Sequence, residues 1–133
     1  MAVVGKGEKR GYVNKKGEVV IKLQFEEAES FSEGMAAVIL DGRSVIIGKT
    51  GKTVLEPRGF YASSFHEGYA VVYSNGNKTY KEINDELDQH GNDPKYKEEF
   101  KDKLKISIID RQGKVVYEMP KKMLKMIFEL DQN

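Results

Sequence analysis

The chain has 133 residues, which is enough for one domain with a single core but not for two. Its 22 Lys and Arg residues nearly balance its 21 Asp and Glu residues, and a net charge of +1 gives no general attraction to nucleic acid or to an anionic membrane. Cysteine is absent, which excludes disulfides, thiolate metal sites and cysteine nucleophiles. Because no apolar run predicts a membrane helix and the first residues lack a secretory signal, we expect a cytoplasmic protein.

Two nine-residue stretches of the chain are nearly the same. SFSEGMAAV occupies 30–38 and SFHEGYAVV occupies 64–72, an offset of 34 residues. The same offset aligns NKKGEVVI at 14–21 with GKTGKTVL at 48–55, and a third copy, DRQGKVVY, follows at 110–117. This copy comes 62 residues after the second, so the third unit carries an insertion of about 28 residues, placed at about 75–102. We therefore predict one domain of three repeats: 1–34, 35–68 and 69–118.

Each repeat predicts three short antiparallel strands. In the second, MAAVIL, RSVIIG and KTVLE are rich in branched aliphatic residues, and the turn signals DG and KTG separate them. The first and third repeats have KKG and RQG at the place of KTG, where glycine supplies the positive φ of a tight turn. The expected fold is mainly β, with the three meanders packed either as a short solenoid or as a closed, barrel-like array.

Longer connections lead from one repeat to the next. Gly34 and Gly68 stand just before a new strand, where glycine allows a sharp bend. We expect the aromatic side chains of the connections to fold back and cover the sheets: Phe25, Phe31, Phe60 and Phe65.

The stretch RGYVNKKGEVVI, followed by QFEEAESFSEGMAAV, resembles the WG repeat of bacterial proteins. The signature of that repeat is Trp-Gly followed by a strand, a turn glycine, Val-Ile and then Phe-x-Glu-Gly-x-Ala. The resemblance covers residues 1 to about 74, and more weakly 105–118. The tryptophan itself is missing, because its three positions hold Arg10, Ser44 and Ile106. The resemblance implies a β-repeat scaffold that works as a binding module rather than as an enzyme.

The insertion contains the stretch NDPKYKEEFKDKLK, which predicts a helix capped by Asp93 and opened by Pro94. Tyr96, Phe100 and Leu104 recur at helical spacing and form a narrow apolar stripe. This helix either packs across an open end of the sheet or docks a protein partner. In the second case, the contact residues we expect are Tyr80, Tyr96, Lys97, Phe100 and Lys101.

The last fifteen residues, 119–133, predict a second helix that begins after Pro120. Met123, Leu124, Ile127 and Phe128 fall on one face of it. We expect this face to cap the open end of the repeats. Exposed methionines there would instead suit a protein partner, and a homodimer through this helix satisfies both interpretations.

The sequence offers little for catalysis. His66 and His90 are the only histidines, and we expect His90 to lie in a polar turn. His66 and its neighbour Glu67 would point to opposite faces of a strand, which makes them a poor acid–base pair. The same glutamate recurs at Glu33 without a histidine, which favours a structural task such as bonding backbone amides at the bend. No spacing predicts a metal site, a cofactor or a phosphate loop.

The preferred functional hypothesis is therefore a non-enzymatic module that binds a protein. The alternative is a binder of a small ligand, such as a nucleotide or another phosphate-bearing molecule. A hydrolase-like enzyme using His66 and Glu67 comes third. The pocket we expect for a small ligand lies between repeats and is formed by Arg43, Arg58, Tyr61, His66 and Tyr69.

Overall fold

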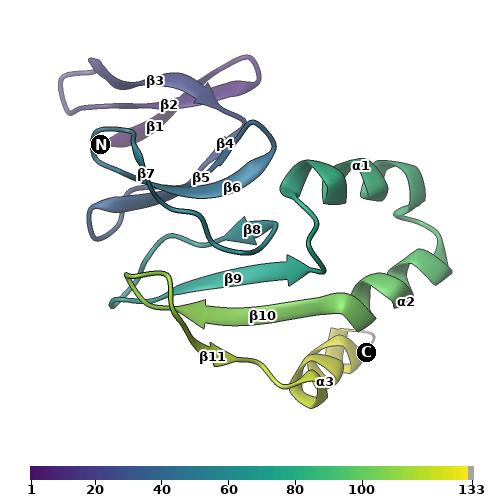
Figure 1. Cartoon of the computed structure of the whole chain (residues 1–133). Coiled ribbons are helices and arrows are strands. Elements are labelled where there is room, and N and C mark those ends of the chain that lie inside the picture. The colour runs from purple at the N-terminus through teal and green to yellow at the C-terminus, as the bar shows by residue number, and fades with distance from the viewer. Residues whose placement is uncertain (132–133) are drawn as a thin grey trace.

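The structure is a computed structural model that describes residues 1–131, and its strands form three antiparallel sheets (Figure 1). The first unit comprises β1 (Ala2–Lys6), β2 (Lys9–Val13) and β3 (Val19–Phe25). The second comprises β4 (Glu27–Ala28), β5 (Met35–Leu40), β6 (Arg43–Gly48) and β7 (Thr53–Leu55). The third comprises β8 (Tyr61–Ala62), β9 (Ala70–Asn75), β10 (Leu104–Ile109) and β11 (Val115–Glu118). The helices are α1 (Tyr80–His90), α2 (Pro94–Lys103) and α3 (Lys121–Asp131).

The mainly β fold and the three meanders are confirmed. In each unit the three principal strands pair with their neighbours in chain order, and the connections add the two-residue strands β4 and β8. The closed, barrel-like array is wrong, because the described strands form three separate open sheets. The physical reason is that β3 and β7 each end their sheet as an edge strand without pairing with the unit that follows, and β11 ends the third sheet without pairing with the first.

The second unit is buried on both faces, between the other two. Along β6, Val45 and Ile47 pack into one core cluster with Tyr12 of the first unit. Ile46, which points the other way, packs into a second cluster with Ile109 of the third unit. The continuous apolar runs of β5 and β6 follow from this position, since a strand covered on both sides has no face to give to water.

The phenylalanines of the connections contribute to these clusters, as expected. Phe25, which the structure places at the end of β3, and Phe65 are 0% and 1% exposed. Phe31 packs edge-on against Tyr12, with 4.7 Å between the ring centroids. Phe60 is half-buried beside a ring of α2 at 6.1 Å.

The two nearly identical nonapeptides lie against each other. The Ser64 hydroxyl donates to the Ser30 carbonyl at 3.0 Å, and the Gly68 amide donates to the Glu33 carboxylate at 2.9 Å. Each nonapeptide also turns sharply at its Glu-Gly pair. At the first, φ is +56° for Glu33 and +80° for Gly34, the combination that a two-residue hairpin loop needs. The repeated letters therefore encode one turn that stacks on its own copy.

A second stacked contact joins the turn of each unit to the third strand of the unit before it. At Gly51 a side-chain carbon would lie 3.1 Å from Ile21, and at Gly113 it would lie 3.2 Å from Leu55. Both glycines have positive φ, +88° and +83°. Glycine is thus needed twice over, for the turn conformation and for the close approach of the next unit.

The insertion holds two helices where the sequence indicated one. We missed α1 because its surface is almost wholly polar, with Ile83 as its one buried residue. The missed signal is the capping box that Thr79 and Glu82 form at its start. His90 consequently lies in the last turn of α1, not in a polar turn, and it is exposed. Leu104, expected on the stripe of α2, begins β10 instead.

The tail helix α3 is present, but only part of its predicted face is buried. Leu124 is 4% exposed, whereas Met123 and Ile127 are 45% and 42% exposed. Phe128 is half-buried. Within residues 1–131, no helix is both long and apolar enough to cross a membrane.

We predict that Gly51→Ala destabilises the protein more than Gly17→Ala. Both positions have positive φ, +88° and +81°, so alanine costs about 1–2 kcal/mol at each. Only at position 51 does the new carbon also press on Ile21, since Gly17 has nothing within 4 Å. The overpacking adds about 1–3 kcal/mol, measured as the free energy of unfolding in urea. Equal losses for the two variants would contradict the stacked contact.

Stability should also depend on Glu33 in a pH-dependent way. The hydrogen bond from Arg111, with help from the Gly68 amide, lowers the pKa of Glu33 from its ordinary value of 4.5. A lowered pKa means that the stabilisation is complete above about pH 4.5 and is lost as the pH falls through the folded-state value. Glu33→Gln should therefore lower the melting temperature at pH 7, and the difference from the wild type should shrink below about pH 4.

Glu67→Gln is the matched control for that experiment. Glu67 occupies the equivalent turn position, with a φ of +52°, and is exposed. At low protein concentration its substitution should leave the melting temperature nearly unchanged at every pH. A Glu33→Gln effect that stays constant from pH 7 to about pH 3 would mean that the carboxylate charge is not the cause.

Candidate anion-binding site

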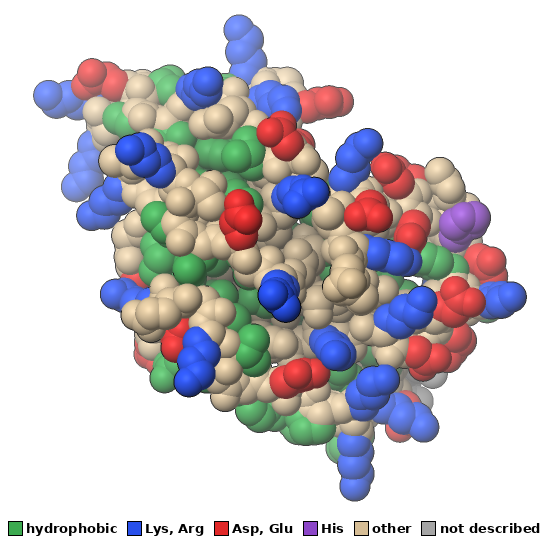
Figure 2. All heavy atoms as spheres, viewed as in Figure 1, with side chains coloured by type: hydrophobic (Ala, Val, Ile, Leu, Met, Phe, Trp, Pro, Cys, Tyr) green, Lys and Arg blue, Asp and Glu red, His purple; other side chains and the backbone are tan. Residues whose placement is uncertain are grey.

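A hollow of about 570 Å³ lies between the second and third units. Its wall is formed by the start of β6, the segment after β7, the end of β9 with the loop to α1, and the start of β10. In the view of Figure 2 the centre of the molecular face is hollowed, and basic side chains stand around it. The residues that line this basic hollow are Arg43, Ser44, Val45, Glu56, Pro57, Arg58, Gly59, Ser74, Gly76, Asn77, Lys78, Thr79 and Lys105.

Positive charge dominates the basic hollow. Four of its lining residues are cationic and one, Glu56, is acidic. Lys78 is paired with Glu86 of α1, with 2.8 Å between Nζ and Oε1, and Lys105 lies 3.9 Å from a glutamate of β11. Arg43 and Arg58 make no ion pair with any residue in the described range 1–131. Their guanidinium groups are therefore available to an anion.

The wall of the hollow contains an unsatisfied polar group. Ser44 is 6% exposed, and its hydroxyl has no hydrogen-bond partner among the described residues. An unpaired buried hydroxyl costs about 1–3 kcal/mol. The hydroxyl oxygen has almost no accessible surface, so it meets a ligand atom only if the wall of the hollow shifts.

The first turn of α1 is fixed at the rim. The Lys81 amide donates to the Gly42 carbonyl at 3.0 Å, which ties the helix to the turn between β5 and β6. Thr79, which lines the hollow, is the N-cap of α1 and forms the capping box with Glu82. The Glu82 amide bonds to Thr79 and the Lys81 amide bonds to Gly42, so the helix start contributes the positive end of its dipole to the rim more than hydrogen-bond donors.

Of the five residues predicted to form a ligand pocket, the structure brings two together. Arg43 and Arg58 both line the basic hollow, and Tyr61, His66 and Tyr69 do not. The backbones of His66 and Tyr69 bond to each other at the hairpin turn before β9, and both residues are exposed. The hollow lies at the opposite end of β9, roughly 15 Å away for a strand of this length.

Tyr61 has a structural partner of its own. Its hydroxyl donates to the Glu29 carboxylate, and its ring lies 6.3 Å from that of Tyr80. Burial, together with the bond to Glu29, raises the pKa of Tyr61 above its ordinary value. The phenol therefore stays protonated and joins the second and third units.

The five residues predicted for partner docking lie on α1 and α2. Tyr80 stacks near Tyr61 as just described, and the Tyr96 hydroxyl donates to Glu86 at 3.1 Å. The backbone carbonyl of Phe100 accepts a bond from Asn75, which is 2% exposed, at 2.8 Å. These contacts place Phe100 against the third unit and Tyr96 against α1.

The two predicted lysines of α2 differ in their surroundings. Lys97 is exposed. Lys101 is half-buried. Its Nζ atom lies 5.5 Å from the centre of the Phe128 ring and 3.9 Å from Oε1 of Glu98.

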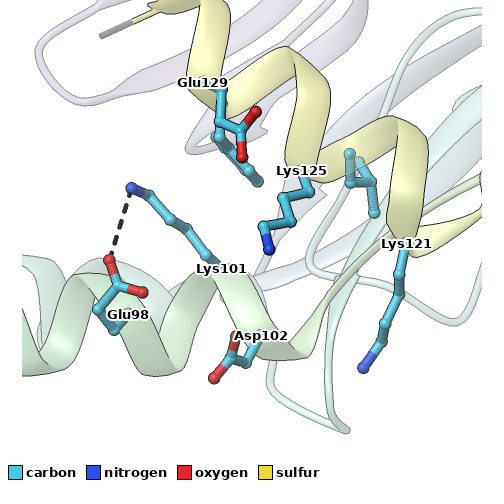
Figure 3. A pocket seen from close by; sticks show the side chains of 8 residues that line it. Glu98, Lys101, Asp102, Lys121, Lys125 and Glu129 are labelled. Carbon is cyan, nitrogen blue, oxygen red and sulfur yellow. Dashed lines mark ion pairs between the residues drawn. The ribbon is translucent and has the colours of Figure 1, made fainter.

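Lys101 also lines a groove of about 420 Å³ between α2 and α3. Figure 3 shows that α2 contributes Glu98, Lys101 and Asp102 to this groove. The opposite side comes from α3, and the floor contains Leu124 and Phe128. Acidic and basic groups alternate around the groove, so it presents no single charge to a ligand.

No cluster of residues for metal binding exists in the described part of the chain. There is no group of three or more His, Asp and Glu side chains placed to hold an ion. His66 and Glu67 make no side-chain bond to each other among the contacts of the described residues. The geometry offers the basic hollow as the strongest candidate site.

Sequence reasoning missed Ser44, Lys78 and Lys105 as members of this site. Ser44 had been singled out as one of the three residues at the missing tryptophan position, but not as a ligand contact. Lys105 aligns with Arg43 at the offset of 62 residues, so the repeat itself could have pointed to it, whereas Lys78 carries no such signal. Lys78 lies near the start of the insertion and Lys105 just after it, and only the folded chain shows that they face one hollow.

Comparison with known families supports the resemblance found in the sequence. A family model described as "WG containing repeat" matches residues 11–43 and 46–77. The chain belongs to this family of WG-repeat proteins. Comparisons with curated proteins and with solved structures gave no match.

The repeat alignment, rather than the matched ranges, relates the basic hollow to a departure from the repeat, since those ranges leave out residues 44 and 45. Ser44 and Val45 occupy the second repeat's positions for the signature tryptophan and glycine, and both line the hollow. A serine side chain is far smaller than an indole, and here it is buried in the wall. The hollow thus coincides with a departure from the repeat pattern.

Proposed function

We propose that this protein is a non-enzymatic binding module, a short solenoid of three WG-like repeats whose basic hollow takes a phosphate-bearing small molecule. The observation that carries the proposal is the pair of unpaired guanidinium groups, Arg43 and Arg58, beside the buried hydroxyl of Ser44. The repeats supply a rigid wall, and the insertion supplies the rim.

Phosphate is the chemical group that fits these residues best. An arginine guanidinium is planar and presents its N–H donors in a fork that matches two phosphate oxygens. Lys78 and Lys105 add positive charge at the rim. The carboxylate of Glu56 repels negative groups on its own side of the hollow, which disfavours a ligand that is negative along its whole length. The volume of about 570 Å³ is in the range of small-molecule sites.

Isothermal titration calorimetry with pyrophosphate, ADP and adenosine tests the proposal. We expect heat of binding for pyrophosphate and ADP and none for adenosine, with an affinity that falls as the salt concentration rises. Arg58→Ala should weaken binding about tenfold to a hundredfold, because it removes one charged donor.

Two further variants separate the hollow from general surface charge. Ser44→Trp introduces the family's residue at a buried position and should abolish binding when the indole fills the hollow, and its circular dichroism spectrum checks that the fold is kept. Lys97→Ala removes an exposed charge of α2 outside the hollow and should bind as the wild type does. Loss of binding in Lys97→Ala equal to that in Arg58→Ala would reject the hollow as the site, as would the absence of binding by the wild type.

A protein partner at the two helices is the second candidate function. It is favoured by the groove between α2 and α3 and by exposed apolar side chains on α3, namely Met123, Met126 and Ile127. Methionine-rich surfaces adapt to different partners, and the tail helix would supply the apolar contact while Lys97 and Lys101 supply charge. For this function, Ile127→Lys should abolish complex formation with the partner, whereas Ser44→Trp should leave it intact.

A further inference from the structure

Consecutive units meet according to one rule. The turn glycine of a unit packs on the third strand of the unit before it, Gly51 on Ile21 and Gly113 on Leu55. The paired residues are equivalent in the repeat, because Ile21 aligns with Leu55 and Gly51 aligns with Gly113. The same interface is therefore built twice within one chain.

Each end of the stack keeps one unmatched half of this interface. Gly17 is the equivalent turn glycine of the first unit, and a side-chain carbon there would meet nothing within 4 Å. Tyr117 is the equivalent third-strand residue of the third unit, and it is 44% exposed where Ile21 is 3% exposed. The neighbouring valines of β11 are exposed too, but this does not indicate a missing contact, since their counterparts in β3 are equally exposed.

An ion pair follows the same rule. Arg111 lies in the turn of the third unit, and its Nη2 atom is 2.6 Å from Oε1 of Glu33, in the turn just before β5. One unit further along the chain, the residue equivalent to Glu33 is Glu67. Its partner would lie in the turn of a fourth unit, and if the first unit of another copy takes that place, the residue equivalent to Arg111 is Lys15. Both side chains are exposed, and neither has an ion pair within the described part of the chain.

We propose that copies of this chain associate head to tail, with the first unit of one copy stacked on the third unit of the next. The Gly17 turn would rest on Tyr117, and Lys15 would pair with Glu67 across the interface. The occupant is a second copy because the first unit carries the complementary half of the contact that the third unit lacks. The proposal is independent of the basic hollow, which lies between the second and third units.

The tail helix leaves room for this contact. In Figure 1, α3 lies beyond the end of β11 and beside α2, and the edge of β11 is open. α3 reaches Tyr117 through one bond, in which the tyrosine hydroxyl donates to the Met123 sulfur at 3.7 Å. The interface is of the heterologous type, so it does not close at two copies and gives a growing chain of subunits.

Sedimentation velocity of the full chain over a wide concentration range is the first measurement. We expect the weight-average mass to rise with concentration and to pass that of a dimer. A mass that stays at one chain throughout would overturn the proposal.

A charge exchange then tests the geometry. Glu67→Lys alone places two positive groups in the interface, and Lys15→Glu alone places two negative groups there, so each should associate about threefold to tenfold more weakly than the wild type. In an equimolar mixture every contact between unlike copies pairs opposite charges, and association should return. Lys6→Glu is the control, because it makes the same change of charge at the end of β1, away from the turn that contains Lys15. It should associate as the wild type does.

The rival arrangement is a closed dimer in which the two β11 edges pair with each other. It predicts a mass that stops at two chains, association that Tyr117→Lys abolishes, and no effect of Lys15→Glu. That pattern, or a mixture of the two charge variants that fails to recover, would reject head-to-tail stacking. Because Lys15, Glu67 and Tyr117 are all exposed, these variants should keep the wild-type circular dichroism spectrum.

Discussion

The structure depends on the burial of the second unit from both sides. Successive residues of β6 point alternately into two core clusters, Val45 and Ile47 toward the first unit and Ile46 toward the third. A three-stranded sheet alone would expose at least one of these apolar faces, so the second unit is stable only when both neighbours are in place. The stacked turns at Gly51 and Gly113 set how closely the units approach, because a side chain at either position would press on the unit before it.

The candidate site arises where this regular packing is interrupted. Ser44 lies on β6 at the position that the repeat signature gives to tryptophan, and the space of the hollow lies beside it. The insertion after β9 then encloses that space, because α1 is held to the turn between β5 and β6 by the bond from Lys81 to Gly42. Scaffold and site therefore overlap: Arg43 and Lys105 occupy the same place in the second and third repeats, whereas Lys78 and the rim come from the insertion.

The local features could be predicted because their causes are local. The KKG, KTG and RQG turns, the strand alternation and the helix after Pro94 all follow from backbone preferences within a few residues. The helix α1 was missed because its apolar pattern is too weak, Ile83 being its one buried residue. The structure brings Arg43 and Arg58 to one hollow, but Tyr61 does not line it, since its hydroxyl is held by Glu29, which lies outside the hollow as well. Such partners are distant in the sequence and leave no pattern in it.

By itself the sequence determined the repeat, the strands and turns of each unit, and the membership of the WG-repeat family. These depend on residue spacing, and a period of 34 residues is visible without coordinates. Only the tertiary structure decided that the sheets stay open and which residues meet in the basic hollow. The physical reason is that Arg43, Arg58, Lys78 and Lys105 come from four separate segments, and their positive charges converge only when the stacking of the units fixes those segments side by side.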